Sequence, residues 1–242
     1  MRNLEVGPEG ARIRWVELPG AEPATVYLHG LGSSAPAYFA QVAAATGRRS
    51  LLIDFLGFGL SDRPADFGYT MAEHADTVAT LLRSVDLVSV RVVAHSMGGA
   101  IAILLAERNP GLVSELVLAE ANLRPAERRA LSARIAAYSE DEYVQTMHGR
   151  ILNVIGTEWA ATARQADPVA MHRSAVSLAA GSYLETLCAL DIPRTFLLGE
   201  QSPRPAGLDE LVAAGATVTI IPGGSHNMML DNPKAFTEAL TR

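Results

Sequence analysis

The sequence predicts an α/β domain built on a mostly parallel sheet flanked by helices, with a helical insertion. Three observations support this prediction. The chain has 242 residues with 49% hydrophobic and 19% charged side chains, which is enough to bury one sizeable core. Short apolar runs alternate with helical patterns along most of the chain, as in βαβ units. Between residues 123 and 184 this alternation stops, and only helical patterns occur.

Eight apolar runs have the length and composition of strands. The first two are joined by the turn-rich residues 7–10, and we expect them to form an antiparallel edge of the sheet. The other strands alternate with helices, which predicts parallel pairing. The expected strands cover residues 4–6, 11–18, 24–28, 50–53, 90–94, 115–119, 195–198 and 217–221.

Capping and helix-breaking residues mark the helices. Thr70 and Glu73 form a capping-box pattern that opens a helix running to about residue 85. Asn232 followed by Pro233 is typical of a helix start and opens the last helix. The other core helices are expected at residues 36–46, 97–107 and 206–214. Helical patterns in the insertion cover residues 125–139, 140–155, 158–165 and 168–184.

The helical insertion interrupts the sheet between two strands. Such an insertion lies over the strand ends, where open α/β sheets bind ligands. We therefore expect residues 123–184 to form a cap, or lid, over a pocket, with residues 1–122 and 185–242 forming the core.

Composition and charge argue against several classes of protein. The net charge is −6 and no basic stripe is present, which disfavours nucleic-acid binding. No apolar run is long enough to span a membrane, and the first residues lack the apolar region of a signal peptide. The single cysteine, Cys188, suits a reducing compartment, so a cytoplasmic location is expected. The sequence leaves the oligomeric state open.

Residues 90–99 read as a strand, a sharp turn carrying one serine, and the start of a helix. Residues 94–98 have the pattern A-x-S-x-G, which differs from the G-x-S-x-G nucleophile elbow only at Ala94. Alanine is the smallest replacement for that glycine, so the strand and helix can still approach closely. The pattern predicts that Ser96 stands at the tip of the turn as a nucleophile. An ordinary loop serine is the alternative.

A nucleophilic serine needs a base within hydrogen-bond reach and an acid that orients the base. His226 follows the last expected strand, in a loop that returns to the sheet edge near Ser96, and is the predicted base. Two acids are candidates: Glu120 after residues 115–119, and Glu200 after the next strand. We favour Glu120, because it ends an apolar strand on the same sheet edge as Ser96.

His95 adjoins Ser96, but neighbouring side chains at a strand end point apart, so His95 is expected to be structural. None of the histidines has metal-ligand spacing to a partner, so no metal site is predicted.

Stabilising the negative charge of an acyl-transfer intermediate needs two backbone amides, and we expect them from Leu31 and Met97. Several residues in the insertion, the glycine-rich loop and the His226 loop are candidate substrate contacts. They are Gly30, Trp159, Tyr183, Met147 and Met228. Aromatic residues and methionines at helical spacing also fit plain packing of the insertion.

Four segments, at residues 29–32, 54–62, 94–99 and 224–229, together resemble the α/β-hydrolase superfamily. The resemblance covers nearly the whole chain and implies the α/β-hydrolase fold with an eight-stranded sheet, a Ser–acid–His triad and no cofactor. Ser202 stands after the seventh strand, where most members keep their triad aspartate. That loss supports Glu120, because some members, such as zearalenone lactone hydrolases, place a glutamate after the sixth strand.

The combined pattern predicts a serine hydrolase, a carboxylesterase or lactonase, that cleaves a small-molecule ester or lactone with Ser96, His226 and Glu120. Two alternatives stay open. The same groups could hydrolyse an amide or a carbon–carbon bond, or the scaffold could serve as a ligand-binding receptor, since fold does not decide function.

Overall fold

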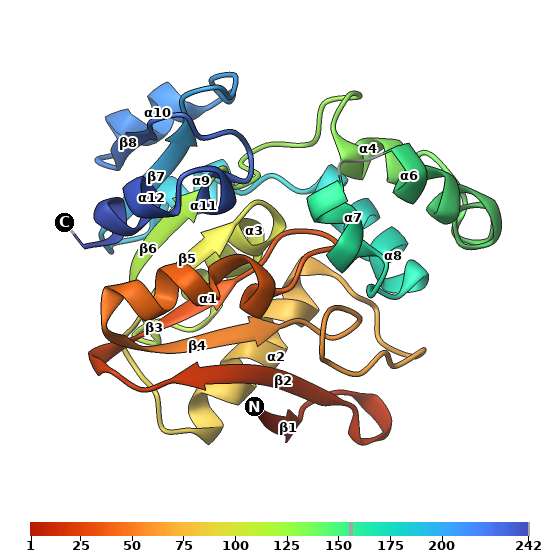
Figure 1. Cartoon of the computed structure of the whole chain (residues 1–242), viewed down its shortest axis with the longest axis horizontal. Helices are drawn as coiled ribbons and strands as arrows, with labels where there is room; N and C mark the ends of the chain where they lie inside the picture. The colour runs from red at the N-terminus through yellow and green to blue at the C-terminus, as the bar shows by residue number, and fades with distance from the viewer. Residues whose placement is uncertain (155–156, 242) are drawn as a thin grey trace.

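A computed structural model of the chain describes residues 1–154 and 157–241, and the side chains of residues 154, 157 and 158 are left out of the description. Eight strands form one sheet in the order β1-β2-β4-β3-β5-β6-β7-β8 (Figure 1). The β2 strand runs antiparallel to β1 and β4, and the other neighbouring pairs are parallel. This confirms the expected mostly parallel sheet with an antiparallel edge. The strands are β1 (Arg2–Glu5), β2 (Arg12–Leu18), β3 (Ala21–Leu28), β4 (Arg48–Asp54), β5 (Val90–His95), β6 (Val113–Ala119), β7 (Arg194–Gly199) and β8 (Thr217–Ile221).

Two apolar cores cover the two faces of the sheet, because successive residues of a strand point to opposite faces. Val92 of β5 packs into one core with α2 (Met71–Ser84) and α3 (Met97–Arg108). Its neighbour Val93 packs into the other core with α1 (Ala35–Thr46), α11 (Met228–Asp231) and α12 (Pro233–Leu240). Figure 1 shows α1, α11 and α12 on one side of the sheet and α2 on the other.

The helix starts expected from capping residues are present. Thr70 and Glu73 form both hydrogen bonds of a capping box at the start of α2. The Asn232 side chain accepts a hydrogen bond from the Ala235 amide at the start of α12. The short helix α11 was not expected, and it begins two residues after His226.

In the described residues between β6 and β7 the regular elements are all helical, and they lie beyond the carboxyl ends of the central strands (Figure 1). In this insertion α4 packs against α8, whereas α9 packs against α3 and α10 of the core. No helix in the described ranges is long and apolar enough to cross a membrane. The described helices between β6 and β7 are α4 (Leu131–Ala136), α5 (Glu140–Glu142), the π-helical turn η2 (Tyr143–Met147), α6 (His148–Val154), α7 (Thr157–Ala163), α8 (Pro168–Ala180) and α9 (Leu184–Ala189). Helix α10 (Leu208–Ala213) lies between β7 and β8.

The helical insertion differs from expectation at its entry and exit, where residues 125–130 and 181–183 are not helical. Backbone hydrogen bonds instead join the entry of the insertion, residues 123–126, to its exit, residues 179–183. The Ala126 amide donates to Ala179 O at 2.9 Å, and the Tyr183 amide donates to Leu123 O at 2.8 Å. The expected helix over residues 140–155 runs without a break from residue 140 to residue 154, with the π-helical turn η2 inside it, and residue 155 lies outside the described part of the chain.

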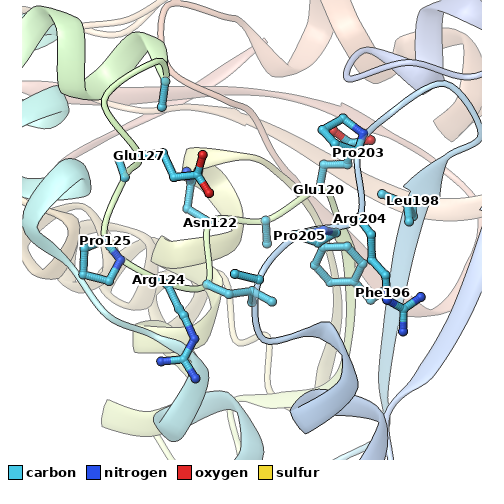
Figure 2. A pocket seen from close by; sticks show the side chains of 15 residues that line it. Glu120, Asn122, Arg124, Pro125, Glu127, Phe196, Leu198, Pro203, Arg204 and Pro205 are labelled. Carbon is cyan, nitrogen blue, oxygen red and sulfur yellow. The ribbon is translucent and has the colours of Figure 1, made fainter.

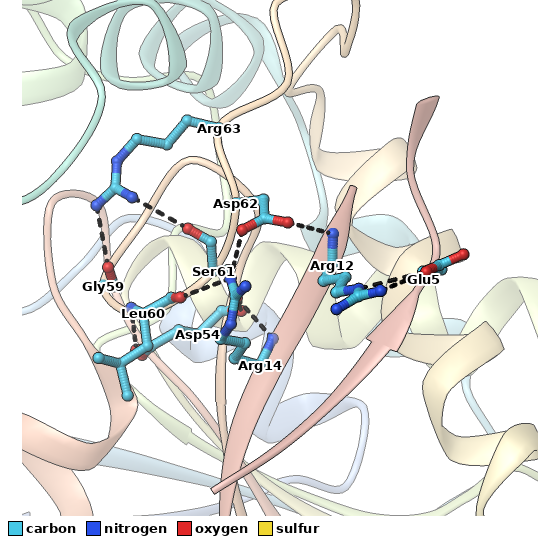
Figure 3. A network of polar contacts seen from close by, with 9 residues as sticks. All are labelled: Glu5, Arg12, Arg14, Asp54, Gly59, Leu60, Ser61, Asp62 and Arg63. Carbon is cyan, nitrogen blue, oxygen red and sulfur yellow. Dashed lines mark hydrogen bonds and ion pairs between the residues drawn. The ribbon is translucent and has the colours of Figure 1, made fainter. Parts of the chain in front are cut away.

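A polar network joins the loop after β4 to β2 (Figure 3), and Asp54 extends it to α1. The buried Asp54 carboxylate accepts hydrogen bonds from the Leu60 amide at 2.9 Å and the Ala35 amide at 2.8 Å. Arg14 of β2 donates to Leu60 O at 2.9 Å and pairs with Asp62. Asp54 therefore holds the first turn of α1, directly after the glycine-rich loop that carries Leu31.

Candidate active site

Ser96 occupies a sharp turn between β5 and α3. Its backbone has φ 51° and ψ −117°, in the positive-φ region that costs a non-glycine residue roughly 1–3 kcal/mol. A side chain at Gly98 or Gly99 would collide with neighbouring groups: a Cβ at Gly98 would lie 2.6 Å from His29 O, and one at Gly99 would lie 2.3 Å from the Ala121 Cβ. The two glycines thus let α3 start close against the sheet, as the elbow pattern requires.

Glu120 follows β6 on the same edge and also has a positive φ, of 45°. Its amide continues the sheet by donating to Leu197 O at 3.0 Å. One carboxylate oxygen, Oε2, lies 2.8 Å from Nδ1 of His226, and the other accepts from the Gly199 amide at 3.1 Å. The structure thus brings Glu120 and His226 together.

The Glu120 side chain is largely buried, with 12% of its surface exposed, whereas His226 is 55% exposed. Burial acts to raise the pKa of Glu120. Hydrogen bonds from His226, the Ser202 hydroxyl and the Gly199 amide outweigh that effect and hold the pKa below its usual value. A carboxylate can only accept hydrogen bonds, so the proton lies on Nδ1 of His226 and leaves Nε2 free to accept one.

Glu200, the other candidate acid, has a different partner. Its Oε2 accepts a hydrogen bond from the Gly223 amide at 2.8 Å. That bond holds the turn after β8 and does not involve the imidazole of His226.

Ser96 and His226 line one cavity of about 320 Å³, together with Gly30, Leu31 and Trp159. The Ser96 hydroxyl donates a long hydrogen bond, 3.5 Å, to Oδ1 of Asn122. No hydrogen bond joins Ser96 to His226 in this structure, in which both residues are described. Proton transfer between the two groups would therefore require the hydroxyl or the imidazole to move.

The Leu31 and Met97 amides suit the stabilisation of negative charge. Among the described residues, neither amide donates a hydrogen bond to another protein group. Leu31 lines the cavity, and its carbonyl accepts a hydrogen bond from the indole Nε1 of Trp159 at 2.8 Å. That bond holds the glycine-rich loop against the helical insertion and leaves the Leu31 amide unpaired.

Three candidate substrate contacts lie away from the residues that line this cavity. Met228 is fully buried in the core formed with α1 and α12. Tyr183 is buried with its hydroxyl against Gly181, at the exit of the helical insertion. Met147 packs, partly buried, against the main core. All three serve packing in this structure, which is the alternative that their helical spacing left open.

His95 is buried and touches the His226 loop. Its Nε2 lies 2.8 Å from the backbone carbonyl of His226, and the two rings are 4.7 Å apart. Burial, and secondarily the nearby His226, lowers the pKa of His95 well below its usual value, so its ring is neutral. A carbonyl only accepts, so Nε2 of His95 is the donor. A histidine directly before the expected nucleophile was the only sequence signal for this contact.

Asn122 also lines the cavity without having been expected from the sequence. Its position two residues after Glu120, on the same sheet edge, is the signal that could have identified it. Leu131 and Leu178 line the cavity from α4 and α8, and their helical spacing gives no such signal. Among the described residues, no cluster of three His, Cys, Asp or Glu side chains could hold a metal ion.

Comparisons with known proteins agree with this architecture. A model of the alpha/beta hydrolase family matches residues 25–239. The esterase Rv0045c of Mycobacterium tuberculosis is 30% identical over 236 residues, which cover 92% of this chain and 72% of that protein. The matches to several other curated relatives cover only 21% to 32% of their length.

Solved structures show the same fold at lower identity. An esterase from Exiguobacterium antarcticum has a TM-score of 0.81 and 22% identity, with 98% of this chain and 97% of that chain covered. An enol-lactonase from Burkholderia xenovorans LB400 has a TM-score of 0.82 and 19% identity, with 99% and 98% covered.

Proposed function

Because this chain belongs to the alpha/beta hydrolase family, we propose that it is a serine hydrolase that cleaves a carboxylic ester or lactone through an acyl-enzyme. The observation that carries the proposal is the 2.8 Å contact between Glu120 and His226 beside a cavity that both His226 and Ser96 line. An acid paired to an imidazole next to a strained serine is the combination that nucleophilic acyl transfer needs.

In this mechanism Ser96 Oγ attacks the substrate carbonyl while Nε2 of His226 takes the hydroxyl proton. His226 then gives that proton to the leaving alcohol oxygen. Water attacks the acyl-enzyme by the same route in reverse, and its proton returns through His226 to Ser96. Glu120 keeps the imidazole in the required tautomer and stabilises its charged form.

The negative charge on the carbonyl oxygen would be held by the Leu31 and Met97 amides. Removing one such donor typically costs a hundredfold or more in kcat, so the position of the Leu31 loop is important. The helical insertion would act as a lid, since Trp159 contacts that loop from α7 and Leu131 and Leu178 close the cavity.

One curated relative supports ester cleavage over the amide and carbon–carbon alternatives. That relative, which matches 92% of this chain and 72% of its own length, is named an esterase. We also place the enzyme in the cytoplasm, because its single cysteine suits a reducing compartment.

The test is turnover of p-nitrophenyl butyrate, with a panel of aryl esters, acyl lactones, resorcylic lactones and anilides to identify the substrate class. Ser96→Ala should lower kcat by about a thousandfold or more. A fluorophosphonate probe should label the wild type at Ser96 and leave the variant unlabelled. Unchanged turnover in Ser96→Ala contradicts the nucleophile assignment, and a wild type that is neither labelled nor active on any panel member favours the receptor alternative.

A further inference from the structure

We propose that a second cavity beside the reaction pocket binds a positively charged, amine-bearing part of the substrate, with Glu127 as the residue that recognises it. This inference rests on the proposed function, because it names a substrate class for the same site. It concerns a cavity of about 390 Å³ between the start of the helical insertion and the loop after β7.

The two cavities adjoin. Asn122 and Ala130 line both, and Glu120, whose carboxylate bonds His226, lines the second. In this proposal a substrate whose carbonyl lies at Ser96 extends past Asn122 into the second cavity.

Two arginines and two glutamates line the second cavity, and both arginines pair with carboxylates that lie outside its lining. Arg124 pairs with both Glu185 and Glu210, and Arg204 pairs with Asp209. Figure 2 shows both guanidinium groups pointing away from Glu127. Each lining arginine is thus already matched by at least one carboxylate.

Of the two glutamates that line the second cavity, Glu120 pairs with His226, and Glu127 is the one without an ion pair among the described residues. It is exposed, and within the described residues its side chain has no cationic partner. In Figure 2 its carboxylate is directed towards Asn122 and the interior of the cavity. An unpaired carboxylate in a pocket attracts a cation and repels an anion.

The rest of the lining is mostly apolar, and includes Phe196, Leu198, Pro125, Pro203 and Pro205. Apolar and aromatic walls with one carboxylate that is outside any ion pair suit an alkylammonium group, whose methyl or methylene groups pack on the walls while the charge faces the acid. A carboxylate-bearing or phosphate-bearing substrate would face Glu127 with like charge.

The experiment compares two esters that differ only in charge, choline butyrate and its carbon isostere 3,3-dimethylbutyl butyrate. The measured quantity is the ratio of their kcat/KM values, charged over neutral. We expect Glu127→Gln to lower this ratio about two- to fivefold, the size of an exposed ion pair. Glu127→Lys should lower it further. Added salt should reduce the wild-type ratio and have little effect on that of Glu127→Gln.

Glu142→Gln is the matched control, because Glu142 is also an exposed glutamate of the insertion and lines neither cavity. Its ratio should equal that of the wild type. Equal losses in both variants, or no loss in Glu127→Gln, would overturn the proposal.

A binding measurement separates this inference from the proposed function. Calorimetry of choline butyrate with Ser96→Ala protein, with and without Glu127→Gln, measures recognition without turnover. Binding that weakens with Glu127→Gln while the wild type hydrolyses no ester would leave the charged subsite standing and reject the esterase proposal. If the wild type hydrolyses esters but Glu127→Gln does not change the binding of choline butyrate, the esterase proposal stands and the charged subsite is rejected.

Discussion

Nδ1 of His226 lies 2.8 Å from Oε2 of Glu120, although 106 residues of chain separate them. The contact joins the end of β6 to the loop after β8, with β7 between the two strands in the sheet. Ser202 stands after β7, and its hydroxyl helps to lower the pKa of Glu120. A neutral residue at that position thus supports an acid supplied by the neighbouring strand.

The two candidate acids can be separated by charge-neutral substitutions. Glu120→Gln should lower kcat by about a hundredfold to ten-thousandfold, because the amide no longer holds the His226 tautomer or its charge. Glu200→Gln should change kcat little, since its partner is the Gly223 amide. Steady-state kinetics on p-nitrophenyl butyrate measures both, and a larger loss in Glu200→Gln would transfer the role to Glu200.

His95 should act as a positioning residue through its hydrogen bond to the His226 carbonyl. His95→Phe keeps a ring but removes the donor, so we expect kcat to fall about tenfold with a smaller change in KM. His95→Gln can place an amide N–H near the lost Nε2 and should recover part of the activity. Equal losses of kcat in the two variants would indicate a packing role alone.

Trp159 should influence catalysis through the Leu31 loop. Trp159→Phe preserves most of the aromatic surface but removes the 2.8 Å hydrogen bond to Leu31 O. Its loss should cost about 1 kcal/mol of loop stability, and kcat should fall severalfold because the Leu31 amide is less well positioned. Single-turnover acylation kinetics tests this, and a change confined to KM would assign Trp159 to substrate contact instead.

Stability should fall on acidification because of the buried histidines. Burial lowers the pKa of His74 from 6.5 to about 3. Between these two values His74 is protonated in the unfolded chain but not in the folded chain. The contribution of neutral His74 to the free energy of unfolding is therefore fully present above pH 6.5 and is lost progressively as the pH falls towards 3. Each such histidine contributes a slope of about 1.4 kcal/mol per pH unit.

Denaturant unfolding between pH 7 and pH 4 measures this slope. His74→Gln should have a slope shallower by about that amount, whatever its stability at pH 7. Glu120, with a lowered pKa, adds stability above its unfolded pKa that is lost as the pH falls through its folded value. An unchanged slope in His74→Gln would contradict a neutral buried His74.

Within the fold, local patterns predicted what local physics controls. Strand alternation, the capping box at Thr70 and the cap at Asn232 depend on neighbouring residues, and the structure confirms all of them. The helix predicted at residues 125–130 was wrong, because backbone hydrogen bonds join the entry of the insertion to its exit, more than fifty residues further along the chain.

For the candidate site, too, some features could be predicted from local sequence patterns and others depended on the tertiary structure. Ser96 could be proposed from the sequence because an elbow needs small residues at fixed spacing, and Glu120 and His226 could be proposed because strand ends of a parallel sheet share one edge. The sequence by itself therefore determined the fold class, the elbow and the residues available for chemistry. Only the tertiary structure decided that Glu120 rather than Glu200 meets His226, that His95 holds the His226 loop, and that Met147, Tyr183 and Met228 serve packing. These outcomes depend on side-chain directions and on distances between segments far apart in the chain, and local periodicity carries no information about either.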